Sequence, residues 1–111
     1  MKLIMAIIRI DRMNETKRAL AAIGVDSMTA TGKALGRGSG YPIPGGNNTF
    51  QPRLRPQRVL NIAVPDNQVA AIVRTLIRVN QTPAAGDGKI FVLPLHESVR
   101  VRTGETGESI L

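Results

Sequence analysis

The chain has 111 residues and a formal net charge of +7, and this length favours a single domain. It contains no cysteine and one histidine, which excludes a disulfide framework and a cysteine-based metal site. The positive charge favours polyanionic partners such as nucleotide phosphates or nucleic acid. Proteins that bind single-stranded nucleic acid by base stacking need several aromatic residues, and this chain has only two phenylalanines and one tyrosine. The apolar start MKLIMAIIRI is too short to span a bilayer, so we expect a cytoplasmic protein.

The first half of the chain predicts a strand, a helix and a second strand. Residues 2–10 are apolar and β-branched, which predicts a buried strand. The pattern over residues 12–23 predicts a helix that stops at Gly24. β-Branched residues predict a strand over 27–35, where Gly32 indicates a bulge.

The next stretch, GRGSGYPIPGGNNTFQPRLRPQ, shows no hydrophobic period. It is rich in Gly, Pro, Asn and Ser, and it carries several arginines but no acid. Irregular loops longer than about 12–15 residues are uncommon in compact domains and are usually functional or disordered. We therefore expect a basic, functional loop here.

The second half repeats the order of elements. The alternation in RVLNIAV, residues 58–64, predicts a strand, and apolar residues at helical spacing predict a helix from Pro65-Asp66 to residue 78. A loop is predicted over 81–88 and a strand over 89–95. Alternation in ESVRVRTG predicts a short terminal strand over 97–104, with both arginines on one face.

This order, β-α-β, long loop, β-α-β, predicts an α+β protein with the ferredoxin-like split βαβ fold. In that fold two helices cover one face of the sheet. The predicted strands are apolar on both faces. We therefore expect the second face to be covered by oligomerisation.

Glycines and cations gather at three places in the sequence. Gly86-Asp87-Gly88 taken alone is ordinary turn chemistry. Glycines also let backbone N–H groups converge on an anion, and Lys89 adds a charge. Arg100 and Arg102 have guanidinium groups that suit phosphate oxygens, and Gly36-Arg37-Gly38 forms another glycine-rich corner. Together they predict a polyphosphate site.

The motif GDGKIFVLPLHESVRVRTGETG closely resembles the C-terminal signature of the PII signal-transduction proteins. MKLIMAIIR, RALAAIGVDSMTAT, GRG and VPDNQVAAIVRTLIRVNQT match the rest of the family pattern in order, leaving out residues 39–55. KALGRG and VNQT are most similar to the nitrogenase-associated branch.

The resemblance implies a homotrimer of ferredoxin-like subunits that acts as a sensor and not as an enzyme. Residues 1–111 would form one domain, with a T-loop at about 37–57, a nucleotide loop at 82–89 and a C-terminal loop at 100–108. ATP and ADP would compete for clefts between subunits. The T-loop would dock on a target such as an ammonium transporter, nitrogenase or a metabolic enzyme, with no nucleic acid and no membrane contact except through a transporter.

Matched to the family motif, Lys89 is expected on the phosphates, with Arg100 and Arg102 as a phosphate-gripping pair. The full set of nucleotide-binding residues that the resemblance implies is Ile7, Thr29, Gly36, Arg37, Gly38, Val64, Gly86, Asp87, Gly88, Lys89, Arg100 and Arg102.

The chain departs from the family in its T-loop. Ser39-Gly40-Tyr41-Pro42 stands where an Arg-Gln-Lys-like run is usual, and the lysine that pairs with 2-oxoglutarate falls on Gln57. Binding of Mg²⁺ and 2-oxoglutarate therefore stays open.

Other functions remain as alternatives. A divergent sensor of bicarbonate or AMP is one, and a nucleic-acid-binding module is another. An enzyme is disfavoured, because His96-Glu97 has no oriented nucleophile or metal cluster beside it.

Overall fold

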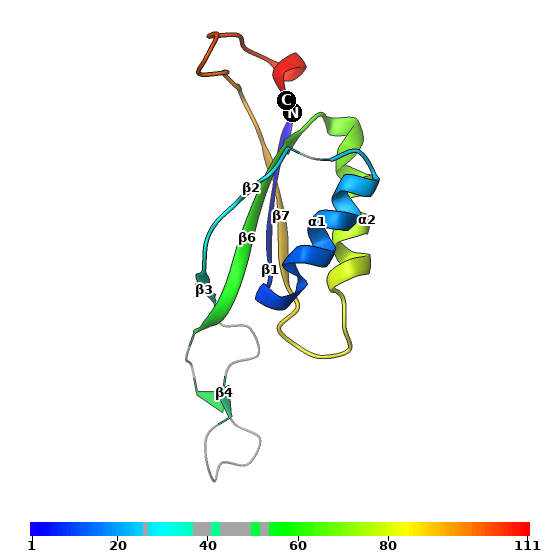
Figure 1. The fold of residues 1–111 in the computed structure, drawn as a ribbon, viewed down its shortest axis with the longest axis vertical. Helices are drawn as coiled ribbons and strands as arrows, with labels where there is room; N and C mark the ends of the chain where they lie inside the picture. Colours follow the sequence, from blue (N-terminus) through cyan, green and yellow to red (C-terminus); the bar gives the residue numbers. More distant parts are fainter. Residues whose placement is uncertain (26, 37–40, 43–49, 52–53) are drawn as a thin grey trace.

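The computed structural model describes residues 1–25, 27–36, 41–42, 50–51 and 54–111 (Figure 1). The predicted α+β order is confirmed. Strand β1 (Lys2–Arg9) leads through a 3-10 turn into helix α1 (Met13–Ala22). Strands β2 (Thr29–Ala30) and β3 (Ala34–Gly36) follow, and then β6 (Arg55–Val64), helix α2 (Val69–Asn80) and β7 (Gly88–Pro94).

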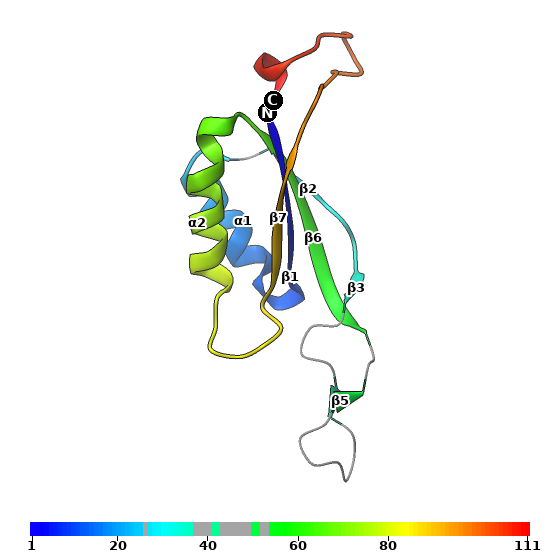
Figure 2. The ribbon, with the colours of Figure 1, turned by 180° about the vertical axis from the view of Figure 1, so that it is seen from behind.

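One antiparallel sheet has the order β2-β6-β1-β7, and β3 also pairs with β6. β1 is therefore central: Ile7 lies opposite Val59 on one side and Lys89 on the other. β7 is an edge strand, joined to α2 by the loop that Figure 2 shows in yellow. Inside the T-loop, β4 (Tyr41–Pro42) pairs with β5 (Phe50–Gln51).

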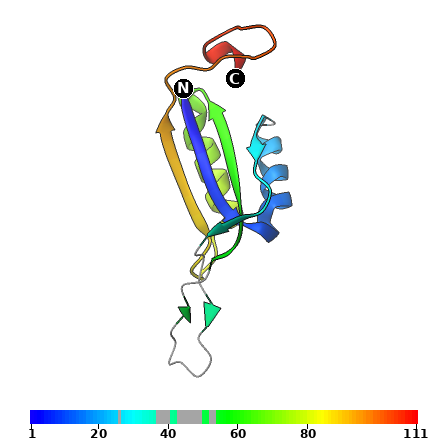
Figure 3. The ribbon, with the colours of Figure 1, turned by 90° about the vertical axis from the view of Figure 1, so that its left-hand side faces the viewer.

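Both helices lie on one face of the sheet, as Figures 1 and 3 show from two directions. The core forms between these layers because alternate strand residues point toward the helices. Ile4, Ile62 and Leu60 of the sheet are fully buried, as are Leu20 of α1 and Ile72 of α2.

The opposite face of the sheet carries apolar side chains that no helix covers. The register places Leu3, Met5 and Ile7 of β1 beside Leu93, Phe91 and Lys89 of β7. Phe91 is 45% exposed and Leu93 is 39% exposed. We call this surface, Leu3, Met5, Ile7, Val59, Ala63, Phe91 and Leu93, the open apolar face.

Several boundaries differ from the sequence prediction, and α2 runs over Val69–Asn80 and not from Pro65-Asp66 to residue 78. The strand predicted over 27–35 is two short strands, interrupted at Thr31–Lys33 around Gly32. β6 begins at Arg55, three residues before the predicted start. The terminal strand predicted over 97–104 is wrong, since this segment turns back on itself and forms one isolated bridge, between Val99 and Thr106.

Neither described helix, α1 or α2, has the length and apolar content needed to cross a bilayer.

Candidate functional site

The loop between α2 and β7 is held by a network centred on Asp87. Thr82 donates to the two carboxylate oxygens of Asp87 from its backbone N–H and from its hydroxyl, each at 2.6 Å. The Arg9 guanidinium lies 3.2 Å from the same carboxylate and donates to the carbonyl oxygen of Ala85 at 2.8 Å. The end of β1 thus fixes the shape of the nucleotide loop.

These contacts lower the pKa of Asp87 below its ordinary value of 3.8. The hydrogen bonds from Thr82 are the main cause, and the positive charge of Arg9 adds to them. A carboxylate that accepts several hydrogen bonds is stabilised in its ionised form. Asp87 therefore organises the loop with its charge.

Close packing against backbone requires a glycine at position 88, and Gly36 lies against the end of a flexible side chain. Gly88 has φ +109°, and a Cβ there would overlap the carbonyl oxygen of Ile7 in β1. A Cβ on Gly36 would overlap the side-chain amide of Gln57. The small size of Gly88 therefore has a structural cause in addition to any role beside a ligand.

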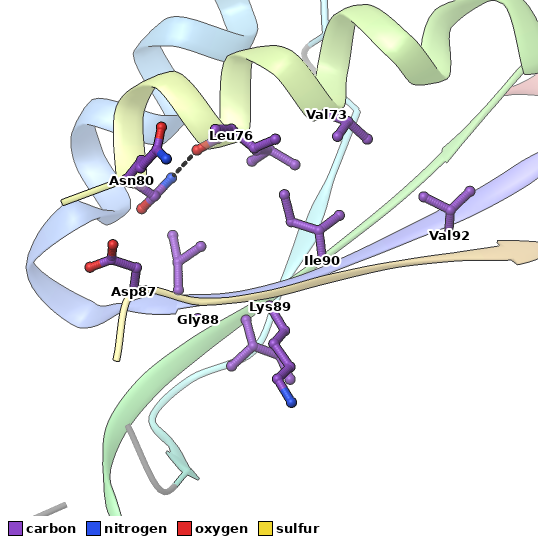
Figure 4. A pocket seen from close by; sticks show the side chains of 12 residues that line it. Val73, Leu76, Asn80, Asp87, Gly88, Lys89, Ile90 and Val92 are labelled. Carbon is purple, nitrogen blue, oxygen red and sulfur yellow. Dashed lines mark hydrogen bonds between the residues drawn. The ribbon is translucent and has the colours of Figure 1, made fainter. Parts of the chain in front are cut away.

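Lys89 points to the face of the sheet away from α2 (Figure 4). It is exposed and lies opposite Ile7 in the β1–β7 register. Within the described part of the chain, its ammonium group takes part in no ion pair. This cation is thus available to a ligand at the open apolar face.

The other predicted cations lie in the C-terminal segment. Backbone hydrogen bonds close this segment, from Arg100 N–H to Glu105 at 2.8 Å and from Gly107 N–H to Ser98 at 3.0 Å. Arg100 pairs with Glu105 at 3.3 Å, and Arg102 is exposed. Because no strand forms here, the two arginines do not share one strand face as predicted.

The predicted residues fall into two groups at opposite ends of the sheet. Gly88 and Lys89 begin β7, while Arg100 and Arg102 follow its far end, where the C-terminal segment lies at the top of Figure 1. A strand of this length spans about 20 Å at about 3.3 Å per residue. One chain therefore does not bring Lys89 and the two arginines to the same phosphate group.

The remaining predicted residues lie near both ends and in the middle of the sheet. Ile7 and Gly36 lie near the nucleotide loop, and Ile7 is half-buried. Val64 ends β6 opposite Lys2 and is buried in the core, and Thr29 pairs with Asn61. Arg37 and Gly38 lie outside the described residues.

A cavity of about 270 Å³ with a mixed polar and apolar lining lies beside the loop between α2 and β7. Arg9, Arg55, Gln57 and Gly86 are among its lining residues. The Nε atom of Arg9 is buried and has no hydrogen-bond partner among the described residues. No group of three or more His, Asp or Glu residues that could hold a metal occurs in the described ranges.

Sequence reasoning missed Arg9 and Thr82 as site residues. Arg9 interrupts an apolar strand and Thr82 precedes the Gly-Asp-Gly turn, so each was a weak local signal. The contact of Arg9 with Asp87 depends on how β1 lies beside β7, whereas Thr82 contacts Asp87 within the same loop, five residues away.

Comparison with known proteins gives concordant results. A family described as "Nitrogen regulatory protein P-II" matches residues 1–105. The "Nitrogen fixation nifHD region GlnB-like protein 2" of Methanobacterium ivanovii is 41% identical, over 100% of this chain and 99% of that protein. The "Nitrogen regulatory protein P-II" of Cereibacter sphaeroides is 36% identical, over 97% of each.

A solved structure, Arabidopsis thaliana PII bound to citrate, has a similar fold. Its TM-score is 0.79 at 32% identity, covering 97% of this chain and 89% of that one.

Proposed function

This chain belongs to the P-II family of nitrogen regulatory signal-transduction proteins, and on that premise we propose that it binds ATP and ADP in clefts between neighbouring copies of itself. P-II proteins are regulators and not enzymes. The observation that carries the proposal is the separation of Lys89 from Arg100 and Arg102 by the length of β7. Lys89 of one chain and the two arginines of a neighbouring chain can contact the same polyphosphate, although the three residues of one chain cannot.

The open apolar face supports the assembly that this requires. Exposed contiguous apolar surface commonly marks an interface between proteins. Phe91 and Leu93 lie on this face beside Lys89, so its burial against other copies would bring Lys89 to a subunit boundary. We propose a homotrimer, in which each cleft pairs the nucleotide loop of one subunit with the C-terminal segment of the next.

We propose that the T-loop is the segment that binds the regulated target protein. It joins β3 to β6, and both strands abut the site: Gly36 lies opposite Arg55, and Gln57 lies opposite Arg9. A nucleotide that contacts the base of the loop with different strength in two conformations would shift their populations. The relatives encoded in nifHD regions support a target in nitrogen metabolism, such as nitrogenase or an ammonium transporter.

Subunit mixing tests the shared site. We expect Lys89→Ala and Arg102→Ala each to weaken ATP binding by about tenfold or more, because each removes a charge-assisted contact to phosphate. In every mixed trimer of the two variants, about one cleft in three combines an intact Lys89 with an intact Arg102, so tight binding partly returns. Co-expression with two affinity tags, followed by calorimetry, measures this.

Two outcomes would contradict the proposal. Unchanged ATP affinity in both single variants would show that Lys89 and Arg102 do not bind the nucleotide. Mixed trimers that form but recover no tight binding would exclude a cleft shared between chains. Size-exclusion chromatography of each single variant controls for loss of assembly.

The same titration of the wild-type protein identifies the effector. The cavity beside the nucleotide loop is lined by Arg9 and Arg55 but also by Asp11, and Gln57 stands where the lysine that pairs with 2-oxoglutarate is expected. ATP binding that tightens with Mg²⁺ and 2-oxoglutarate would indicate a sensor of nitrogen shortage. Adenylate binding that ignores 2-oxoglutarate, or that prefers AMP, would favour the divergent sensor.

A further inference from the structure

A cavity of about 500 Å³ lies between α2 and the edge strand β7, on the helix side of the sheet (Figure 4). Ile7 and Lys89, which the register places on the open apolar face, are also among its lining residues. Apolar side chains form most of its wall: Ile8, Val73, Leu76, Ile77, Ile90 and Val92. Val92 faces this cavity and is 44% exposed, so the helix layer leaves this part of the sheet's inner face uncovered.

A buried polar atom without a partner lies at the end of this cavity. Asn80, the last residue of α2, lines the cavity and is 6% exposed. Its Nδ2 donates to Thr16 Oγ1 at 3.1 Å and to the carbonyl oxygen of Leu76 at 3.0 Å. Its Oδ1 is buried and has no hydrogen-bond partner among the described residues. Because Nδ2 is committed to two acceptors, the free atom calls for a donor.

The charged residues around the cavity indicate which kind of ligand it could bind. Asp87 lies near Asn80 in Figure 4, and its negative charge disfavours an anionic group there. Its oxygens already accept from Thr82 and Arg9. Lys89 points to the opposite face of the sheet. The cavity therefore offers one unfilled acceptor at its polar end and an apolar wall elsewhere.

We propose that this cavity is a second binding site, for a small uncharged amphiphile with an apolar body and a hydroxyl or amide N–H group that donates to Asn80 Oδ1. Its volume falls in the range of small-molecule pockets, and one polar group in an apolar wall is the usual arrangement for orienting a ligand. The cavity shares Asp87, Gly88 and Lys89 with the proposed nucleotide site, and the test below uses the protein without nucleotide.

Benzyl alcohol and toluene are the probes, because they share an apolar body and differ in the donor. Methyl NMR of the wild-type protein, labelled at Ile, Leu and Val, follows each titration. We expect saturable shifts of the Ile8, Leu76, Ile77 and Ile90 methyl groups. Absence of shifts at these residues, or intermolecular NOEs showing that another copy of the chain fills the cavity, would overturn the proposal.

Filling the cavity from either wall should abolish binding. Val73→Trp fills it from α2 and Val92→Trp fills it from β7, so a folding defect in one variant does not decide the result. Ala70→Trp, on the exposed side of α2, is the matched control and should bind benzyl alcohol as the wild-type protein does. Unchanged shifts in folded Val73→Trp and Val92→Trp proteins would place the ligand elsewhere.

The donor is tested by comparing the two probes. Asn80→Leu should reduce the affinity for benzyl alcohol relative to toluene by about fivefold, the effect of one neutral hydrogen bond. Thr16→Val is the control, since it removes the partner of Nδ2 and leaves Oδ1 in place. An unchanged ratio in Asn80→Leu, or an equal change in Thr16→Val, would exclude Asn80 Oδ1 as the acceptor.

Discussion

Asp87 shows how a single carboxylate sets the shape of the nucleotide loop. Its lowered pKa means that the folded state holds the ionised form more strongly than the unfolded chain does. A group of this kind contributes stability above its unfolded pKa, and that contribution is lost as the pH falls through the folded pKa. The network with Thr82 and Arg9 should therefore be intact at neutral pH and should fail in acid.

Thr82→Val removes the hydroxyl donor to Asp87 and keeps the side-chain shape. We expect a lower free energy of unfolding than wild type at pH 7, and a difference that narrows as the pH falls below the ordinary Asp value of 3.8. Urea unfolding followed by circular dichroism across pH 3–7 measures both. Thr103→Val, in the C-terminal segment, is a control without a bond to Asp87. A pH-independent difference would mean that the hydroxyl does not act through the carboxylate.

The elements themselves were largely predictable: α2 and β6 follow from clear periods in the sequence, and β1 follows from a short apolar run. The terminal strand was not. Val99, Arg100, Val101 and Arg102 alternate as a strand would, but Gly104 and Gly107 adopt positive φ and turn the segment back on itself. Alternation predicts a strand only when a neighbouring strand is present to pair with it, and pairing is a property of the fold.

Gly88, which has no Cβ, allows β7 to approach β1 closely. Gly88→Ala should lower the free energy of unfolding by about 2–4 kcal/mol, because the new methyl group would overlap the Ile7 carbonyl at an unfavourable φ. Gly104→Ala is the matched control: its φ is +73° and no atom lies near the added Cβ, so about 1 kcal/mol is expected. Equal losses in urea unfolding would show that backbone strain alone, and not the strand contact, fixes Gly88.

At the scale of the whole molecule, the candidate site could be predicted only in part. The resemblance named both groups of cations, and the motifs were specific. Their placement at opposite ends of the sheet depends on the direction of β7 and on the course of the chain after Pro94. In the proposed assembly, two chains contribute residues to each nucleotide cleft. The sequence contains all of these residues but does not indicate which chain supplies each of them.

Phe91→Lys tests the assembly. It places a charge in the open apolar face and should convert a trimer to monomers, since burying an unpaired ammonium is strongly unfavourable. Ile23→Lys, at the end of α1, is matched in exposure, 44% against 45% for Phe91, and lies on the helix side. Sedimentation equilibrium distinguishes the two. A monomeric wild-type protein, or a Phe91→Lys trimer, would show that this face is not the interface.

The separation of the two cation groups has a genetic consequence. In the proposed assembly every subunit lends residues to the clefts on both of its sides, so a subunit lacking both groups would disable its neighbours' clefts as well as its own. Such an allele, expressed beside the normal gene, would be dominant negative. If a cell makes two related chains that co-assemble, the composition of each cleft would follow their relative expression, and gene dose would tune the range of nucleotide levels that the cell can sense.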